Sequence, residues 1–150
     1  MKNLFDPACV CEIKARLAQI RPDSPRQWGK MNASQAVAHC AAGMELALGD
    51  RRPPRLIMGS IVGHFIKPLV FRDDEPMRRN SPTVKGLVVN DERDLAFERN
   101  RLCGFMDRFA ENGRASCTSH PHAFFGPLTP DEWAILMYKH LDHHMRQFGV

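Results

Sequence analysis

The sequence predicts an all-α fold, a four-helix bundle with short extra helices in one long connection. Apolar residues recur at helical spacing in several separate segments, and little of the chain alternates as a strand would. Helix-start signals precede these segments, and the strongest of them is Thr129-Pro130-Asp131-Glu132. Long helices without strands are typical of bundles. A length of 150 residues predicts a single domain over residues 1–150.

The first helix is predicted from Pro7 to Ile20. Asp6 can cap its N-terminus, and Pro7 suits the first helical position because a backbone N–H there would have no partner within the helix. The apolar face of this helix consists of Val10, Ile13, Leu17 and Ile20. The proline-containing segment RPDSP then ends the helix.

The second helix is predicted from Ala33 to Leu48. Asn32 can cap it, and Gln35 three residues later completes a pattern that resembles a capping box. Gln35 also precedes His39 by one turn, so its alternative role is a hydrogen bond to a metal ligand or to a water at a metal. We favour the capping role.

Residues 51–90 connect the second helix to the third. The apolar segment 56–71 is interrupted by polar residues and a proline, and it is too short to span a bilayer. We expect it to form buried helix or helix fragments, with His64 as a core histidine. The same segment is the surface through which we expect a homodimer to form. Residues 87–89 are expected to be a short extended piece.

The third and fourth helices follow this connection. The third is predicted from Glu92 to Glu111, with Asn90 or Asp91 as its cap and a glycine as its stop. The fourth begins at the capping box described above and ends near Phe148.

The fourth helix carries three histidines in the motif HLDHH. His140 and His144 are four residues apart, so both lie on the same face. This face is otherwise apolar when projected at 100° per residue, whereas Lys139 and Asp142 project toward solvent. His143 projects toward the edge of the apolar band. Two histidines on a buried face are costly unless they are hydrogen-bonded or bind a metal.

A further histidine, His39, lies on a face of the second helix that also carries small residues such as Gly43. If this face packs against the fourth helix, His39 meets His140 and His144 in an open three-histidine metal site. Neutral imidazoles suit Zn, Ni, Fe or Cu, and such an ion lowers the pKa of a water or thiol beside it. Two alternatives remain. The histidines are hydrogen-bonded core residues, or His143 replaces His140 or His144 as a ligand.

His120 and His122 lie in the loop SHPHAFFGPL, which leads into the fourth helix. One role for them, and for His143, is to orient the ligand imidazoles or to form a pocket wall beside them. The alternative, which we favour for the loop, is a rigid aromatic segment in which Phe124 and Phe125 pack on the bundle.

Three segments, WGKMNASQAVAHC, HPHAFFGPLT and EWAILMYKHLDHHMRQFGV, resemble the DinB superfamily. The nearest resemblance is to its uncharacterised bacterial branch, known only as a domain of unknown function. The resemblance implies a DinB/YfiT-like bundle in up-down-down-up order with a long crossover. It also implies a metal bound by one histidine of the second helix and the HxxxH pair of the fourth. In this sequence these residues are His39, His140 and His144.

Characterised DinB relatives include metal-dependent transferases and isomerases that use low-molecular-weight thiols such as bacillithiol or mycothiol. By this resemblance we expect a metalloenzyme, either a thiol-dependent S-transferase or isomerase or a hydrolase, that acts on a small organic substrate. Zinc or nickel is expected first, with iron or manganese as alternatives and a low-molecular-weight thiol as a second cofactor. No catalytic residue is identified. The alternative is a non-catalytic metal- or ligand-binding module, or a stress-related interaction module.

Composition bears on nucleic-acid and membrane partners and on the cellular compartment. The net charge of +4 is small, and no basic stretch interleaved with aromatic residues is visible, so we expect no nucleic-acid partner. The five cysteines are odd in number and include no CxxC pair. The N-terminal segment has no long apolar core, so we expect no signal peptide and no membrane partner. A reduced cytoplasmic protein with free thiols is the simplest expectation.

Overall fold

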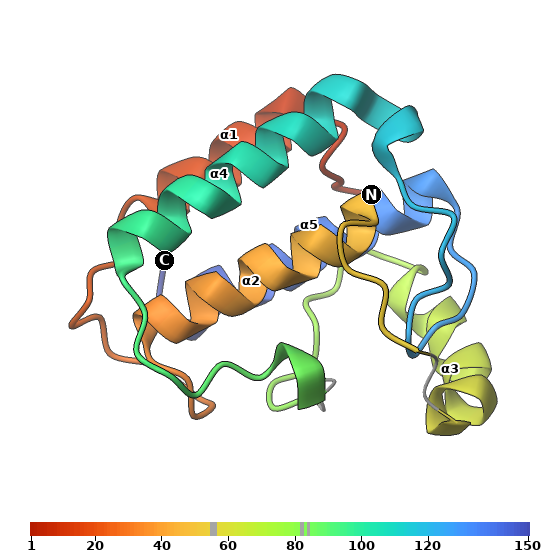
Figure 1. The fold of residues 1–150 in the computed structure, drawn as a ribbon, viewed down its shortest axis with the longest axis horizontal. Helices are drawn as coiled ribbons and strands as arrows, with labels where there is room; N and C mark the ends of the chain where they lie inside the picture. Colours follow the sequence, from red (N-terminus) through yellow and green to blue (C-terminus); the bar gives the residue numbers. More distant parts are fainter. Residues whose placement is uncertain (55–56, 82, 84) are drawn as a thin grey trace.

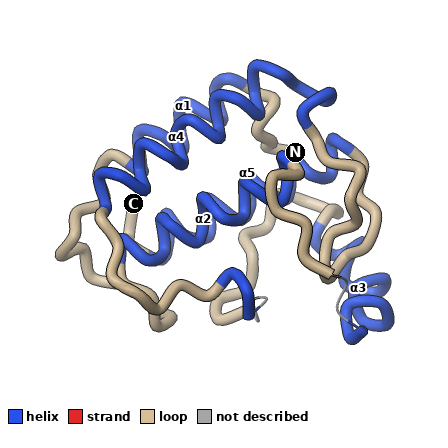
Figure 2. Tube along the Cα trace, in the orientation of Figure 1, coloured by secondary structure: helices blue, strands red, loops and turns tan. Residues whose placement is uncertain are grey.

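The computed structural model describes residues 1–54, 57–81, 83 and 85–150. Its elements in chain order are α1 (Pro7–Leu17), α2 (Ala33–Leu48), α3 (Ile57–Val70), the 3-10 helix η1 (Lys85–Leu87), α4 (Leu95–Asn112), the 3-10 helix η2 (Gly113–Ser116) and α5 (Pro130–Gln147). The described ranges contain no strand (Figure 2), and an isolated bridge joins His122 to Gly126. The all-α prediction is confirmed.

The ends of α2 and the start of α5 agree with the prediction because local hydrogen bonds determine them. In α2 the side chain of Asn32 accepts from the backbone N–H of Gln35, and the side chain of Gln35 accepts from the backbone N–H of Asn32. Gly49 ends this helix in the left-handed conformation. Thr129 and Glu132 form the same reciprocal pair at the start of α5.

The predicted end of α1 is wrong, although its start is confirmed. Asp6 caps the helix by accepting the backbone N–H of Ala8 at 2.9 Å. The helix ends at Leu17 rather than at Ile20. Ile20 is nevertheless buried, because the chain that leaves the helix still lies against the core.

The predicted cap of α4 is also wrong. Asp94, not Asn90 or Asp91, accepts the backbone N–H at the third helical position, and the helix begins at Leu95. The backbone carbonyl of Asp91 instead accepts a hydrogen bond from the side chain of Gln35 at 3.1 Å. The contact with α2 therefore occupies the segment that was expected to open the helix.

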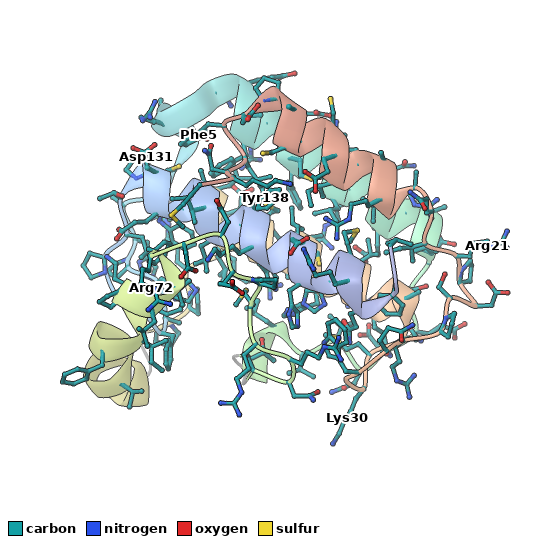
Figure 3. All side chains as sticks on the ribbon, turned by 180° about the vertical axis from the view of Figure 1, so that it is seen from behind. Phe5, Arg21, Lys30, Arg72, Asp131 and Tyr138 are labelled. Atoms are coloured by element: carbon teal, nitrogen blue, oxygen red, sulfur yellow. The ribbon has the colours of Figure 1, made fainter. Side chains whose placement is uncertain are left out.

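α1 and α5 lie side by side and run in the same direction. The hydroxyl of Tyr138 on α5 donates to Glu12 on α1 at 3.0 Å, and Figure 3 shows Tyr138 beside α1. One turn further along both helices, Arg16 forms an ion pair with Asp142 at 2.8 Å. Contacts that advance together along both chains require parallel helices.

α2 and α4 form a second parallel pair, which runs in the direction opposite to α1 and α5 (Figure 1). Arg101 of α4 forms an ion pair with Glu45 of α2, and Arg108 forms one with Asp50 just after α2. The core lies between the two pairs. Its large buried side chains include Ile13, Met44, Leu102, Met106, Phe109, Trp133, Leu141 and Met145. This arrangement is compatible with a four-helix bundle and places α2 against α5.

Two charged residues of α5 are buried, contrary to the prediction. Asp142 binds both Arg16 and Arg146, each at 2.8 Å. Lys139 donates from Nζ to the backbone carbonyl of Val70 at 2.7 Å. The helical projection identified the histidine face, but α1 and the end of α3 cover the neighbouring faces as well. The partners of Asp142 and Lys139 offset the cost of burying their charges.

The expectation that the apolar segment before α4 is buried is wrong for three side chains of α3, whereas Val70 at its end packs against the core. Val62, Phe65 and Leu69 are 38%, 73% and 60% exposed. α3 lies at one end of the molecule (Figure 1), where a Cβ added to Gly63 would overlap the backbone carbonyl oxygen of Phe124. Because the glycine side of α3 makes this close contact, Phe65 and Leu69 project on the opposite side.

The rest of the connection also differs from the prediction. The extended piece predicted at residues 87–89 is wrong at Leu87, which ends the 3-10 helix η1. Leu56 and the side chain of His64 lie outside the described residues. The homodimer stays a prediction. In the part of the chain that the structure describes, no helix combines the length and the apolar character that are needed to cross a bilayer.

Candidate metal centre

Three histidines meet where α2 packs against α5. His140 and His144 lie one turn apart on α5 and face His39 on α2. The ring centroids of all three pairs are 4.9 Å apart. One ligand atom from each residue lies within 4.8 Å of the others, close enough that small ring movements would let all three bind one ion. The predicted meeting of the three imidazoles is confirmed, and metal binding by them stays a prediction.

The hydrogen bonds of two of these rings determine which nitrogen faces the cluster. His39 donates from Nδ1 to the backbone carbonyl of Leu87 at 2.8 Å. His144 donates from Nδ1 to Oε1 of Gln147 at 2.8 Å, and Gln147 in turn donates from Nε2 to the carbonyl of Trp28 at 2.7 Å. With the proton on Nδ1, each neutral ring keeps an unprotonated Nε2. Such orienting bonds are typical of histidines that bind metals.

The third ring, His140, has an incomplete set of partners. Its Nε2 lies 2.9 Å from Nε2 of His39, so one of these two nitrogens must carry a proton when no cation is shared between them. Its Nδ1 is buried and has no hydrogen-bond partner among the described residues. Ligation through Nε2 would let two rings share a cation in place of that single proton. The three residues therefore fit a divalent ion by their chemistry.

Gly43 makes room for the ring of His140. A Cβ built on this residue would lie 2.9 Å from Cε1 and 3.0 Å from Nδ1 of His140. Any larger residue would push the ring away from His39. Glycine inside a helix costs roughly 0.5–1 kcal/mol relative to alanine, so the close approach is obtained at a cost in stability. The prediction that small residues on this face of α2 allow a close approach is confirmed.

Burial keeps the three imidazoles neutral. It lowers the pKa of His144 to about 3, and it lowers the pKa of His140 well below the ordinary value, with the neighbouring histidines adding to the effect. Burial also lowers the pKa of His39, against which the hydrogen bond to Leu87 acts. Neutral rings at neutral pH offer lone pairs to a cation without first losing a proton.

Both ring nitrogens of His143, the alternative ligand, form hydrogen bonds outside the cluster. Its Nδ1 donates to the carbonyl of Met77 at 3.3 Å, and its Nε2 accepts from the indole N–H of Trp28 at 3.4 Å. Arg79 lies over the ring of Trp28 at 4.4 Å from the centroid. His143 therefore joins two loops beside the cluster, and the structure does not bring it into the group of three.

The other predicted site residues are not part of the three-histidine group and form hydrogen bonds elsewhere. Gln35 serves the capping box, so the favoured role is the one that the structure shows. His120 donates from Nε2 to the carbonyl of Pro53 at 3.0 Å. His122 accepts at Nδ1 from the backbone N–H groups of both Phe124 and Phe125, each at 3.1 Å. These bonds fit the rigid aromatic loop that we favoured.

Two orienting partners, the carbonyl of Leu87 and the side chain of Gln147, were not identified from the sequence. Gln147 follows His144 by three residues on the same helix face, and this spacing is a signal that could have found it. No comparable signal exists for Leu87, which is 48 residues away from His39 along the chain.

Comparison with known proteins gives a family and no activity. The family model described as "Protein of unknown function (DUF1569)" matches residues 10–149. A search of curated proteins and a search of solved structures found no match.

Proposed function

The chain belongs to the family described as protein of unknown function (DUF1569), and from that premise we propose that it is a metal-dependent enzyme. His39, His140 and His144 bind one divalent cation through their Nε2 atoms. Zinc or nickel suits three imidazoles best, and iron or manganese is the alternative. The reaction is the transfer or isomerisation of a thiol-linked group, or a hydrolysis, on a small organic substrate.

A single observation carries this proposal: three neutral imidazoles converge, His39 and His144 buried and His140 half-buried, and two of them have Nδ1 occupied by a hydrogen bond. Core histidines that serve packing alone need not present unprotonated nitrogens to one another. Without a cation, the contact between Nε2 of His39 and Nε2 of His140 at 2.9 Å is a hydrogen bond that needs a proton on one of the two nitrogens. A shared cation would take the place of that proton.

Each protein group has a defined part in this proposal. Leu87 and Gln147 orient two of the rings, and Gly43 admits the third. Three protein ligands leave a coordination position for substrate, thiol or water. A divalent cation at this site supplies Lewis acidity, which favours the deprotonated form of a thiol or water at neutral pH. The surrounding core excludes bulk water and strengthens the electrostatic effect.

We also propose a relation to the DinB superfamily. In support of it, α1 and α5 run in one direction, and α2 and α4 run in the other (Figure 1). This is the up-down-down-up order, with α3 and η1 in the long crossover. The thiol-dependent chemistry of characterised DinB relatives is the reason to test thiols first.

Metal analysis of purified protein tests the site. The wild type should contain close to one equivalent of metal after expression or reconstitution, and His39→Ala, His140→Ala and His144→Ala should each lose most of it. His143→Ala is the matched control, because it removes an imidazole from the same helix without removing a ligand. Near-stoichiometric metal in the three alanine variants, with folding confirmed by circular dichroism, would refute the proposal.

A second function, a non-catalytic metal-binding module, is favoured by one observation. The rings of His39 and His144 are buried within the described structure, which restricts access of a substrate. A panel that combines low-molecular-weight thiols with small electrophiles separates the two functions. Turnover that disappears in His144→Ala supports the enzyme. A protein that binds metal but shows no turnover with any pair supports the binding module.

A further inference from the structure

A small cavity lies between the end of α2 and the start of α5. Residues from α2, the loop after it, the loop before α5 and α5 itself line this cavity, and its volume is about 10 Å³. That volume has room for roughly one water-sized atom. The cavity is separate from the three histidines, and its lining includes two of the loop histidines, His120 and His122.

Trp133 lines the cavity with a donor that lacks an acceptor. Its side chain is 1% exposed, and its Nε1–H is buried without a hydrogen-bond partner among the described residues. Buried donors are nearly always paired, so this one calls for an acceptor beyond the described residues, and a bound ligand would supply it.

His122 supplies a second donor. Its Nδ1 accepts two backbone N–H groups, so the proton of the neutral ring must be on Nε2. Burial lowers the pKa of His122 to about 4, which keeps the ring neutral at neutral pH. Its ring lies against that of Trp133, with centroids 5.4 Å apart. The two donors therefore belong to adjacent rings.

Arg51 adds positive charge. Its side chain is 45% exposed, and it contacts Glu45 through Nε at 3.3 Å and the carbonyl of Gly86 through Nη1 at 3.1 Å. Four of the eight lining residues are apolar, and the polar side chains among the others, Arg51, His120, His122 and Trp133, include no acid and one cation. A neutral water would satisfy the tryptophan, but it would make no use of the guanidinium.

We propose that this cavity binds the carboxylate of a small organic acid. One oxygen enters the cavity and accepts from Trp133 and His122, and the other oxygen stays at the mouth beside Arg51. The size of the cavity supports entry of one atom rather than of the whole group.

Nuclear magnetic resonance of the full chain tests the cavity without requiring activity. The probes are sodium propionate and neutral propionamide at constant ionic strength, and the readout is the indole N–H signal of each of the two tryptophans. Trp133→Phe assigns the signals. Propionate should shift the Trp133 signal in a saturable manner and leave the Trp28 signal in place, and propionamide should bind at least tenfold more weakly. Absence of a saturable shift would overturn the proposal.

Variants separate this site from the metal centre. Arg51→Met should raise the dissociation constant of propionate about tenfold, with the spectrum showing that the fold is retained. An unchanged constant would remove the guanidinium from the site and contradict the proposal. His140→Ala should still bind propionate whether or not it binds metal. If the wild type binds metal but gives no propionate shift, the cavity proposal fails and the metal centre stands.

Discussion

Replacing Gly43 with alanine should weaken metal binding while leaving the fold intact. Gly43 lies in the middle of α2, where alanine is the better helix former by roughly 0.5–1 kcal/mol. Helix propensity therefore favours the substitution. Among the described residues, the obstacle is the ring of His140, which occupies the space that the new Cβ needs.

The structure gives the size of this effect. The new Cβ would lie 2.9 Å from Cε1 of His140, whereas carbon atoms pack best at roughly 3.5–4.0 Å. The ring must therefore retreat by about 0.5 Å or more. Metal–ligand distances tolerate deviations of only about 0.2 Å. We expect the dissociation constant for zinc to rise ten- to hundredfold, which corresponds to about 1.4–2.8 kcal/mol.

Competition with a chromophoric zinc chelator measures this constant, and circular dichroism checks the fold. Gly104→Ala is the matched control, because Gly104 lies inside α4 and no described residue outside its own turn of helix comes within 4 Å of a built Cβ. The control should keep the zinc affinity of the wild type and gain roughly 0.5–1 kcal/mol in stability. A folded Gly43→Ala protein that binds zinc as tightly as the wild type would refute the reasoning.

Three further predictions concern the surroundings of the site. Gln147→Leu removes the acceptor that orients His144, and zinc affinity should fall roughly tenfold in the same titration. Lowering the pH from 7 to 5 should destabilise the metal-free protein in urea unfolding. Burial lowers the pKa of His144 from 6.5 to about 3 and that of His122 from 6.5 to about 4, so below pH 6.5 the unfolded chain binds protons that the folded chain does not. Each of the two should cost about 2 kcal/mol at pH 5. Asp142→Ala leaves Arg16 without its buried partner and should lower the free energy of unfolding by about 2–3 kcal/mol.

Each of these predictions has an outcome that contradicts it. Wild-type zinc affinity in Gln147→Leu would show that the orienting bond is unimportant. A free energy of unfolding that stays constant from pH 7 to 5 would mean that the histidines are not held neutral. For the ion pair, the control is Arg114→Ala, whose exposed pair with Asp131 should contribute less than about 1 kcal/mol. Equal losses in Asp142→Ala and Arg114→Ala would contradict the importance of burial.

Local sequence was sufficient where a helix end depends on its own neighbours. The capping box at Thr129 determines the start of α5 by bonds that lie within four residues. The start of α4 was not predictable in this way, because Asn90, Asp91 and Asp94 are all suitable caps. The contact of Asp91 with Gln35 on α2 is tertiary, and local spacing carries no information about it.

In the candidate site, too, some features follow from local sequence and others depend on tertiary contacts. The four-residue spacing of His140 and His144 places both on one face, and the small residue Gly43 opens the face of α2 that meets them. These features are visible in the sequence. The carbonyl that orients His39 comes from Leu87, whose position depends on the path of the long connection. That path follows from packing between distant segments, which periodicity does not describe.

Diffraction from crystals of the zinc-loaded protein, recorded above and below the zinc absorption edge, tests the central claim most directly. We predict one anomalous peak at roughly 2.0–2.1 Å from Nε2 of His39, His140 and His144. The absence of a peak among these three nitrogens, or a peak bound by His143 or the cysteines instead, would contradict it.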